Sequence, residues 1–133
     1  MKYLRDKKRR FQQIISLPFI WSILIPVIVL DIWLELYHRI CFLLYGLAYI
    51  KRSDYIRIDR HRLEYLNWYQ KIGCAYCGYV NGLLHYASVI VGETEKYWCG
   101  IMHQKYPGFK APAHHKEFVK YGDEKEFLKK YKE

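Results

Sequence analysis

Apolar residues gather in the first third of the chain. Residues 14–30 contain no charged side chain, although Pro18 and Pro26 interrupt the run. A helix of this length rises about 25 Å, slightly less than the ~30 Å hydrocarbon core of a membrane. Each proline removes a backbone donor and bends a helix. Since no small-residue cleavage site follows the run, the pattern predicts an uncleaved membrane anchor.

A second apolar segment, residues 32–50, carries polar side chains at helical spacing. Asp31, Glu35 and His38 would lie within roughly 60° of one another on a helix. Such a stripe is costly toward lipid at the centre of a bilayer. It fits a helix in the membrane interface, or a helix whose stripe faces protein or water. Glu35-x-x-His38 also has the spacing of di-iron helical bundles, but a stripe that faces head groups is the simpler interpretation.

The rest of the chain contains shorter runs of helical period. Helices are expected over residues 63–72, 80–91 and 94–104, with a turn at 74–78 and a loop at 106–112. Asp123 is a good N-cap for a last short helix, and Glu126 occupies its capping-box position. The expected fold is therefore mostly α. Residues 1–50 would form a basic N-terminus and a membrane-anchoring helical hairpin, re-entrant or interfacial, and residues 51–133 a small helical cytoplasmic domain.

Charge supports this placement. The formal net charge is +9, and basic residues cluster on both sides of the apolar region. Short basic segments stay in the cytoplasm, so both termini are expected there, with a single straight crossing as the alternative. Each basic side chain near an anionic leaflet contributes about 1 kcal/mol to binding. Membrane lipid with anionic head groups is therefore the expected partner, and no nucleic-acid-binding motif is present.

Four residues after the apolar region could bind a head group or a phosphate. Arginine presents forked donors that suit such an anion. The candidates are Arg57, Arg60, His61 and Arg62. The alternative is an exposed charge network near the membrane.

A cluster of cysteine and histidine residues is the main candidate for chemistry. Cys74 and Cys77 form a C-x2-C pair, and Cys99 and His103 follow as C-x3-H. Residues four apart on a helix point the same way. Three thiolates and one imidazole suit zinc, with iron as second choice. Reduced cytoplasmic thiols favour a metal over a structural disulfide.

This metal hypothesis carries a geometric condition. On an unbroken helix, Cys77 and Cys99 would lie roughly 30 Å apart and could not share an ion. The chain must therefore reverse, most plausibly near Gly92, or break at Asn81-Gly82. On a continuous helix, Cys74 and Cys77 would instead form a redox pair or be small packed residues. The adjacent His114 and His115 are a further source of ligands.

Several segments resemble a family of small uncharacterised bacterial membrane proteins. They are residues 37–42 (YHRICF), 58–68 (IDRHRLEYLNW), 74–82 (CAYCGYVNG) and 95–103 (EKYWCGIMH). The resemblance implies a bacterial inner-membrane location and supports the cysteine and histidine cluster as a unit. It implies no chemistry.

Two functions follow from these patterns. The first is a membrane-anchored cytoplasmic module whose metal site staples a domain with a small core. Such a module would act as an adaptor or assembly factor for another membrane protein. The second is a membrane-associated redox or metal-handling protein that uses the Cys74/Cys77 pair. No nucleophile or phosphate-loop motif of an enzyme is present.

Overall fold

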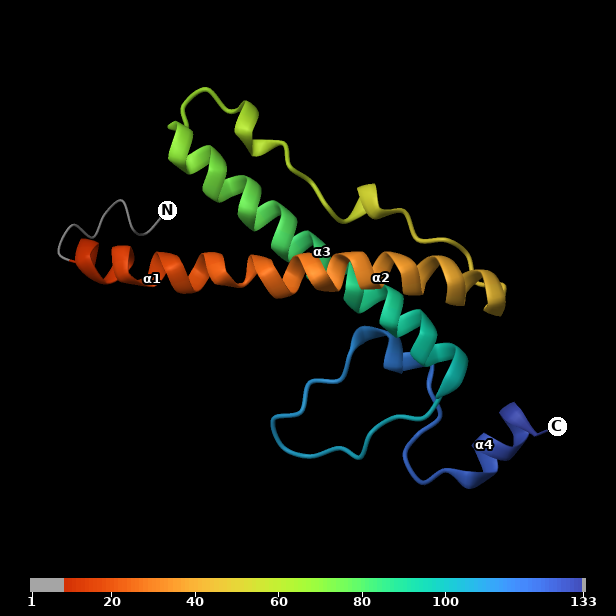
Figure 1. The fold of residues 1–133 in the computed structure, drawn as a ribbon. Coiled ribbons are helices and arrows are strands. Elements are labelled where there is room, and N and C mark those ends of the chain that lie inside the picture. Colours follow the sequence, from red (N-terminus) through yellow and green to blue (C-terminus); the bar gives the residue numbers. More distant parts are fainter. Residues whose placement is uncertain (1–8, 133) are drawn as a thin grey trace. The chain divides into compact units, whose positions relative to one another are not determined.

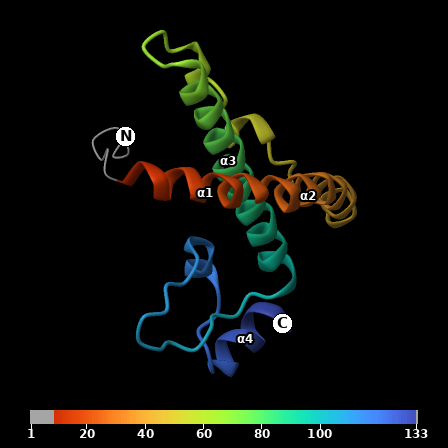
Figure 2. The ribbon, with the colours of Figure 1, turned by 60° about the vertical axis from the view of Figure 1, so that its left-hand side comes forward.

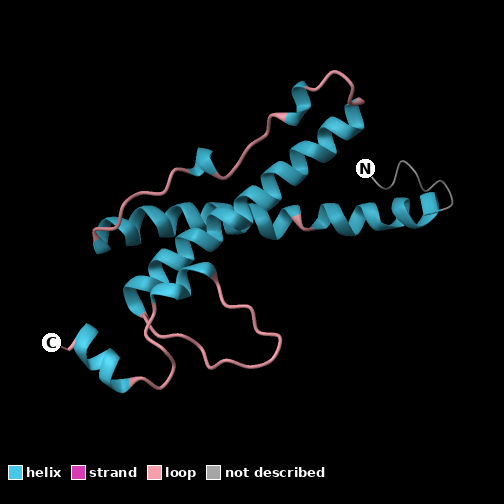
Figure 3. Cartoon of the chain, turned by 180° about the vertical axis from the view of Figure 1, so that it is seen from behind, coloured by secondary structure: helices cyan, strands magenta, loops and turns pink. Residues whose placement is uncertain are grey.

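The fold of the described residues is helical, as predicted. A computed structural model describes residues 9–132. Its helices are α1 (Arg10–Ser22), α2 (Leu24–Tyr45), α3 (Trp68–Trp98) and α4 (Glu124–Tyr131), with short 3₁₀ turns η3 (Arg52–Asp54), η4 (Arg60–Arg62) and η5 (Ala113–Glu117). Within this part of the chain no strand forms (Figure 3), and the nearest approach to one is an isolated bridge between Ile101 and Val119.

Helices α1 and α2 follow each other as one apolar helix. Residues 10–45 are long and apolar enough to cross a membrane, by length and composition. Pro18 lies inside α1, whereas Pro26 lies in the first turn of α2, where a backbone donor is free in any case. Ile23 between the helices keeps helical dihedrals. The prolines therefore interrupt the helix without reversing it, and the hairpin expected in this region is not confirmed.

The chain reverses only after α2. Gly46 ends this helix in the left-handed conformation (φ 66°), which glycine adopts without strain. Residues 46–67 then return to the start of α3, and α3 crosses the rod along α2 (Figures 1 and 2). On the α1 side of this crossing the Tyr76 hydroxyl donates to the Ile20 carbonyl over 2.7 Å.

Two compact units make up the chain. One ends at Tyr86 and the other begins at Ala87, so α3 contributes to both. The segment after residue 50 packs on α2 and belongs to the same unit as the apolar helix. We refer to these parts as the N-terminal unit and the C-terminal unit.

The polar stripe of α2 faces protein in the N-terminal unit. Arg52 donates from both of its terminal nitrogens to the Asp31 carboxylate, and the Tyr79 hydroxyl donates to the same group over 2.7 Å. The Tyr86 hydroxyl donates to Glu35 over 3.2 Å. The stripe, which the sequence placed either in the membrane interface or against protein or water, contacts protein. Its partners come from the return segment and from α3.

His38 completes this network and is fully buried. The backbone N–H of Ile50 donates to its Nε2 over 3.3 Å. Since Nε2 accepts, the neutral ring carries its proton on Nδ1, which faces the Tyr86 hydroxyl at 3.0 Å. Both ring nitrogens are therefore satisfied by protein atoms.

Two glycines on α3 let the return segment approach the helix. A Cβ at Gly78 would lie 2.5 Å from the Arg57 carbonyl oxygen, and one at Gly82 would lie 2.7 Å from that of Tyr55. Both clashes are with backbone, which cannot rotate away. The glycines thus act as contact points inside a continuous helix, whereas the sequence pattern suggested a break.

Replacing Gly82 tests this contact. We expect Gly82→Ala to lower the free energy of unfolding by about 1–2 kcal/mol, because overpacking outweighs the gain in helix propensity. Gly73→Ala is the matched control on the same helix, since nothing lies within 4 Å of its Cβ position. That change should raise stability by up to about 1 kcal/mol. Denaturant unfolding in detergent compares the two, and equal effects would contradict the close contact.

The C-terminal unit is built around the end of α3. Ile90, Phe118 and Val119 are its buried apolar side chains. The backbone N–H of Val119 donates to Gly100, and that of Met102 donates to Val119. Helix α4 begins as predicted, because the Asp123 carboxylate accepts from the backbone N–H of Glu126.

Candidate metal centre

Glu95 is the centre of a polar cluster in the C-terminal unit. It lies in the last turn of α3, and its carboxylate faces two histidines of η5. Oε1 lies 3.0 Å from His115 Nε2, and Oε2 lies 2.7 Å from His114 Nε2. The two oxygens of one carboxylate therefore have two different imidazole partners.

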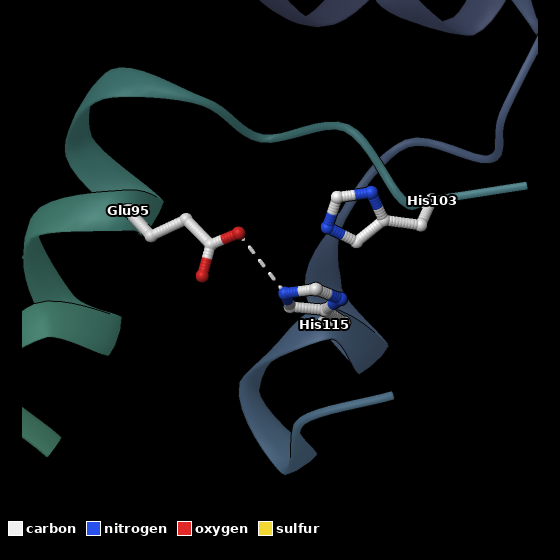
Figure 4. A group of neighbouring side chains, drawn as sticks. All are labelled: Glu95, His103 and His115. Carbon is white, nitrogen blue, oxygen red and sulfur yellow. Dashed lines mark hydrogen bonds and ion pairs between the residues drawn. The ribbon is translucent and has the colours of Figure 1, made fainter. Parts of the chain in front are cut away.

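A third histidine reaches the same place from the segment that follows α3. One ligand atom from each of Glu95, His103 and His115 can be chosen so that all three lie within 4.8 Å of one another. The three side chains face one another across this point, and each comes from a different segment of the unit (Figure 4). A metal ion needs this convergence of donors.

The three side chains of the cluster differ in their exposure to solvent. His115 is 3% exposed, Glu95 is half-buried and His103 is exposed. The ring of His115 stacks on Phe118, with 4.8 Å between centroids. Its Nδ1 is buried without a hydrogen-bond partner in the described chain, so this ring is held by its stacking on Phe118 and by the contact of Nε2 with Glu95. The side on which His103 lies is open to solvent.

The carboxylate is held in its charged form. Its hydrogen bond with His114 lowers the pKa of Glu95 below the usual range, and the neighbouring His115 adds to this against the opposing effect of burial. An ionised carboxylate with neutral imidazoles is the state in which these groups bind a cation.

Comparisons with known proteins do not indicate what this cluster binds. No family model, curated protein or solved structure matches the chain. One carboxylate with two imidazoles is used for zinc in hydrolytic enzymes and for non-haem iron, and three protein ligands leave coordination positions open.

The predicted set of cysteine ligands is not brought together. Helix α3 runs unbroken through Asn81-Gly82 and Gly92 to Trp98, so the reversal that this hypothesis required is not present. Cys74 and Cys77 lie in the helix, while Cys99 follows its end and is exposed; all are free thiols. Of the four residues proposed from sequence, only His103 belongs to the observed cluster.

Gly92 has another role in the unbroken helix. A Cβ at this position would lie 3.0 Å from both Cε1 and Nδ1 of His114. The missing side chain lets the imidazole lie close against α3. A glycine that suggested a chain reversal is therefore a contact point for a loop residue.

Sequence reasoning identified part of this cluster and missed its centre. The sequence offers His114 and His115 as further ligands, and Glu95 only as one of several carboxylates for a di-iron site; it does not join Glu95 to these histidines. Glu95 and Cys99 are four residues apart, and His103 follows four later. This spacing would put all three on one face of a continuing helix, but α3 ends at Trp98, so His103 reaches the cluster through the segment that follows the helix.

The other residues that the sequence suggested as functional sites are not part of this cluster. Arg57, Arg60, His61 and Arg62 are exposed, three of them in η4. A head-group site at these residues stays a prediction, as does redox chemistry at Cys74 and Cys77. Glu35 and His38 bond to Tyr86 and are not part of any potential metal-binding group found among residues 9–132.

Proposed function

We propose that the protein is a membrane-anchored module whose C-terminal unit binds one divalent transition-metal ion through Glu95, His103 and His115. The observation that carries this proposal is the convergence of three donors within 4.8 Å. Zinc is the first choice and iron the second, because both accept a mixed set of imidazole and carboxylate ligands.

The arrangement of the ligands supports a stapling role. They come from α3, from the segment after it and from η5, so one ion ties three segments together. Few apolar side chains are buried in this unit, and small domains commonly gain their stability from a structural metal. A stapled module of this kind suits an adaptor or assembly factor for another membrane protein.

The apolar helix of residues 10–45 is the proposed anchor. Basic residues flank both of its ends, which favours the cytoplasmic side for each. An unreversed helix satisfies both preferences only when it lies along the membrane interface, whereas a straight crossing places its ends on opposite sides. A bacterial inner membrane is the expected location, which rests on the sequence resemblance. Anionic lipid is the expected partner of the exposed arginines near this helix.

Metal content of detergent-purified protein tests the proposal. We expect about one equivalent of zinc or iron after metal-replete expression, and at least a hundredfold weaker binding in Glu95→Gln and His115→Asn. Cys74→Ser and Cys77→Ser should keep the metal. Glu93→Gln is the matched carboxylate control, because Glu93 pairs with Lys96 two residues before the site.

The variants separate the two ligand sets. Loss of metal in Cys74→Ser with normal binding in Glu95→Gln would overturn the proposed site in favour of the thiolates. Absence of metal from the wild-type protein after metal-replete expression would overturn metal binding altogether.

A further inference from the structure

One oxygen of Glu95 is not needed as a ligand. In the proposed site Oε1 faces His115, and Oε2 points away from that histidine toward His114, 2.7 Å from its Nε2. A carboxylate that binds an ion through one oxygen is commonly fixed by a hydrogen bond to the other. His114 is therefore placed to orient the ligand from outside the donor set.

The ring of His114 is held on two sides. Gly92 gives it room against α3, with 3.0 Å between a Cβ position there and the ring. On the other side it makes edge contacts with His115 and Phe118, at centroid distances of 4.7 and 5.7 Å. Its side chain is 19% exposed. This packing directs Nε2 at the carboxylate.

We infer that His114 is a positioning residue for the metal site and that Gly92 is the notch that holds it. This inference rests on the proposed function. Nε2–H of His114 donates to Oε2 of Glu95, which aims Oε1 at the ion and keeps the carboxylate from rotating. His114 is not among the three donors that converge, so it acts through Glu95.

Losing such a partner weakens metal binding without removing a ligand. Second-shell changes of this kind typically cost 10–100-fold in affinity. The stoichiometry and the ligand set stay the same. A ligand change would instead alter the absorption spectrum of bound cobalt, which is sensitive to the donor atoms.

Cobalt(II) titration of the full-length protein in detergent, against a competing chelator, tests this role. We expect His114→Phe, which keeps a ring but has no donor, to bind one equivalent 10–100-fold more weakly with an unchanged spectrum. His114→Gln keeps an N–H donor and should recover part of the loss. Gly92→Ala, which alters no polar group, should weaken binding in the same direction, whereas Gly73→Ala should not.

The possible results distinguish failure of the positioning role from failure of the proposed function. Wild-type affinity in both His114→Phe and Gly92→Ala would overturn the positioning role while leaving the proposed function intact. Loss of the bound equivalent, or a changed spectrum, in His114→Phe would overturn it by making His114 a ligand. A wild-type protein that binds no cobalt would overturn the proposed function, and this inference with it.

Discussion

Arg52→Met is expected to lower the free energy of unfolding of the N-terminal unit by about 3 kcal/mol. Removing one partner of a buried ion pair leaves an uncompensated charge, which costs about 3–5 kcal/mol. Asp31 is only 15% exposed, but Arg52 is 35% exposed, so the lower end of this range applies. The hydrogen bonds to Asp31 raise the pKa of Arg52 above its usual range, against the opposing effect of burial.

The matched control is another arginine of the same unit. Arg39 pairs with Glu35 across one turn of α2, at 3.4 Å, and its side chain is 70% exposed. Exposed pairs of this kind contribute about 0.3–0.5 kcal/mol, so Arg39→Gln should have little effect. Thermal or denaturant unfolding in detergent measures both variants. Equal losses would show that the Asp31–Arg52 pair contributes no more than a surface pair.

A double variant identifies the origin of the loss. If the penalty comes from the unpaired carboxylate, adding Asp31→Asn to Arg52→Met should restore part of the stability. If the loss of unfolding free energy in the double variant equals the sum of the two single losses, the loss comes from the packing of Arg52 and not from the ion pair.

Metal removal is expected to open the C-terminal unit. An ion at one hundred times its dissociation constant stabilises the state that binds it by about 2.7 kcal/mol. This shifts the equilibrium between the closed and the open unit about a hundredfold toward the closed one. The amides of Met102 and Val119 bond across the strand-like contact next to the site. Their hydrogen exchange should therefore become up to about a hundredfold faster when a chelator removes the ion.

The amide of Leu47 gives the internal control. It bonds to Phe42 at the end of α2 in the N-terminal unit, so its exchange should not change with metal. Unchanged exchange at Met102 and Val119, in protein shown to have lost its ion, would contradict the stapling role. The same measurement on Glu95→Gln should resemble the chelated wild-type protein.

Local signals in the sequence predicted the parts of the fold that depend on near neighbours. The Asp123 cap and the loop at 106–112 follow from short-range backbone chemistry, and the structure has both. The spacing of Asp31, Glu35 and His38 correctly placed them on one face of a helix. The sequence could not show that Arg52 is the partner of this face.

The expected helices differ from the observed ones mainly at glycine residues. Gly73 and Gly92 suggested helix ends, because glycine is unfavourable in a helix interior. Gly82 and Gly92 instead serve close contacts with Tyr55 and His114, residues 27 and 22 positions away along the chain. Only the folded arrangement shows what a Cβ would meet. The metal centre could not be predicted from the sequence for the same reason, because Glu95 meets His115 only after residues 99–112 turn back.

The separation of Asp31 from Arg52 has a consequence for biosynthesis. The arginine follows the carboxylate by 21 residues, a delay of about one to four seconds at 5–20 residues per second. During that interval Asp31 has been synthesised and its arginine partner has not. A chain cut just after Gly46 would therefore leave this carboxylate without the ion pair that it has in the full chain.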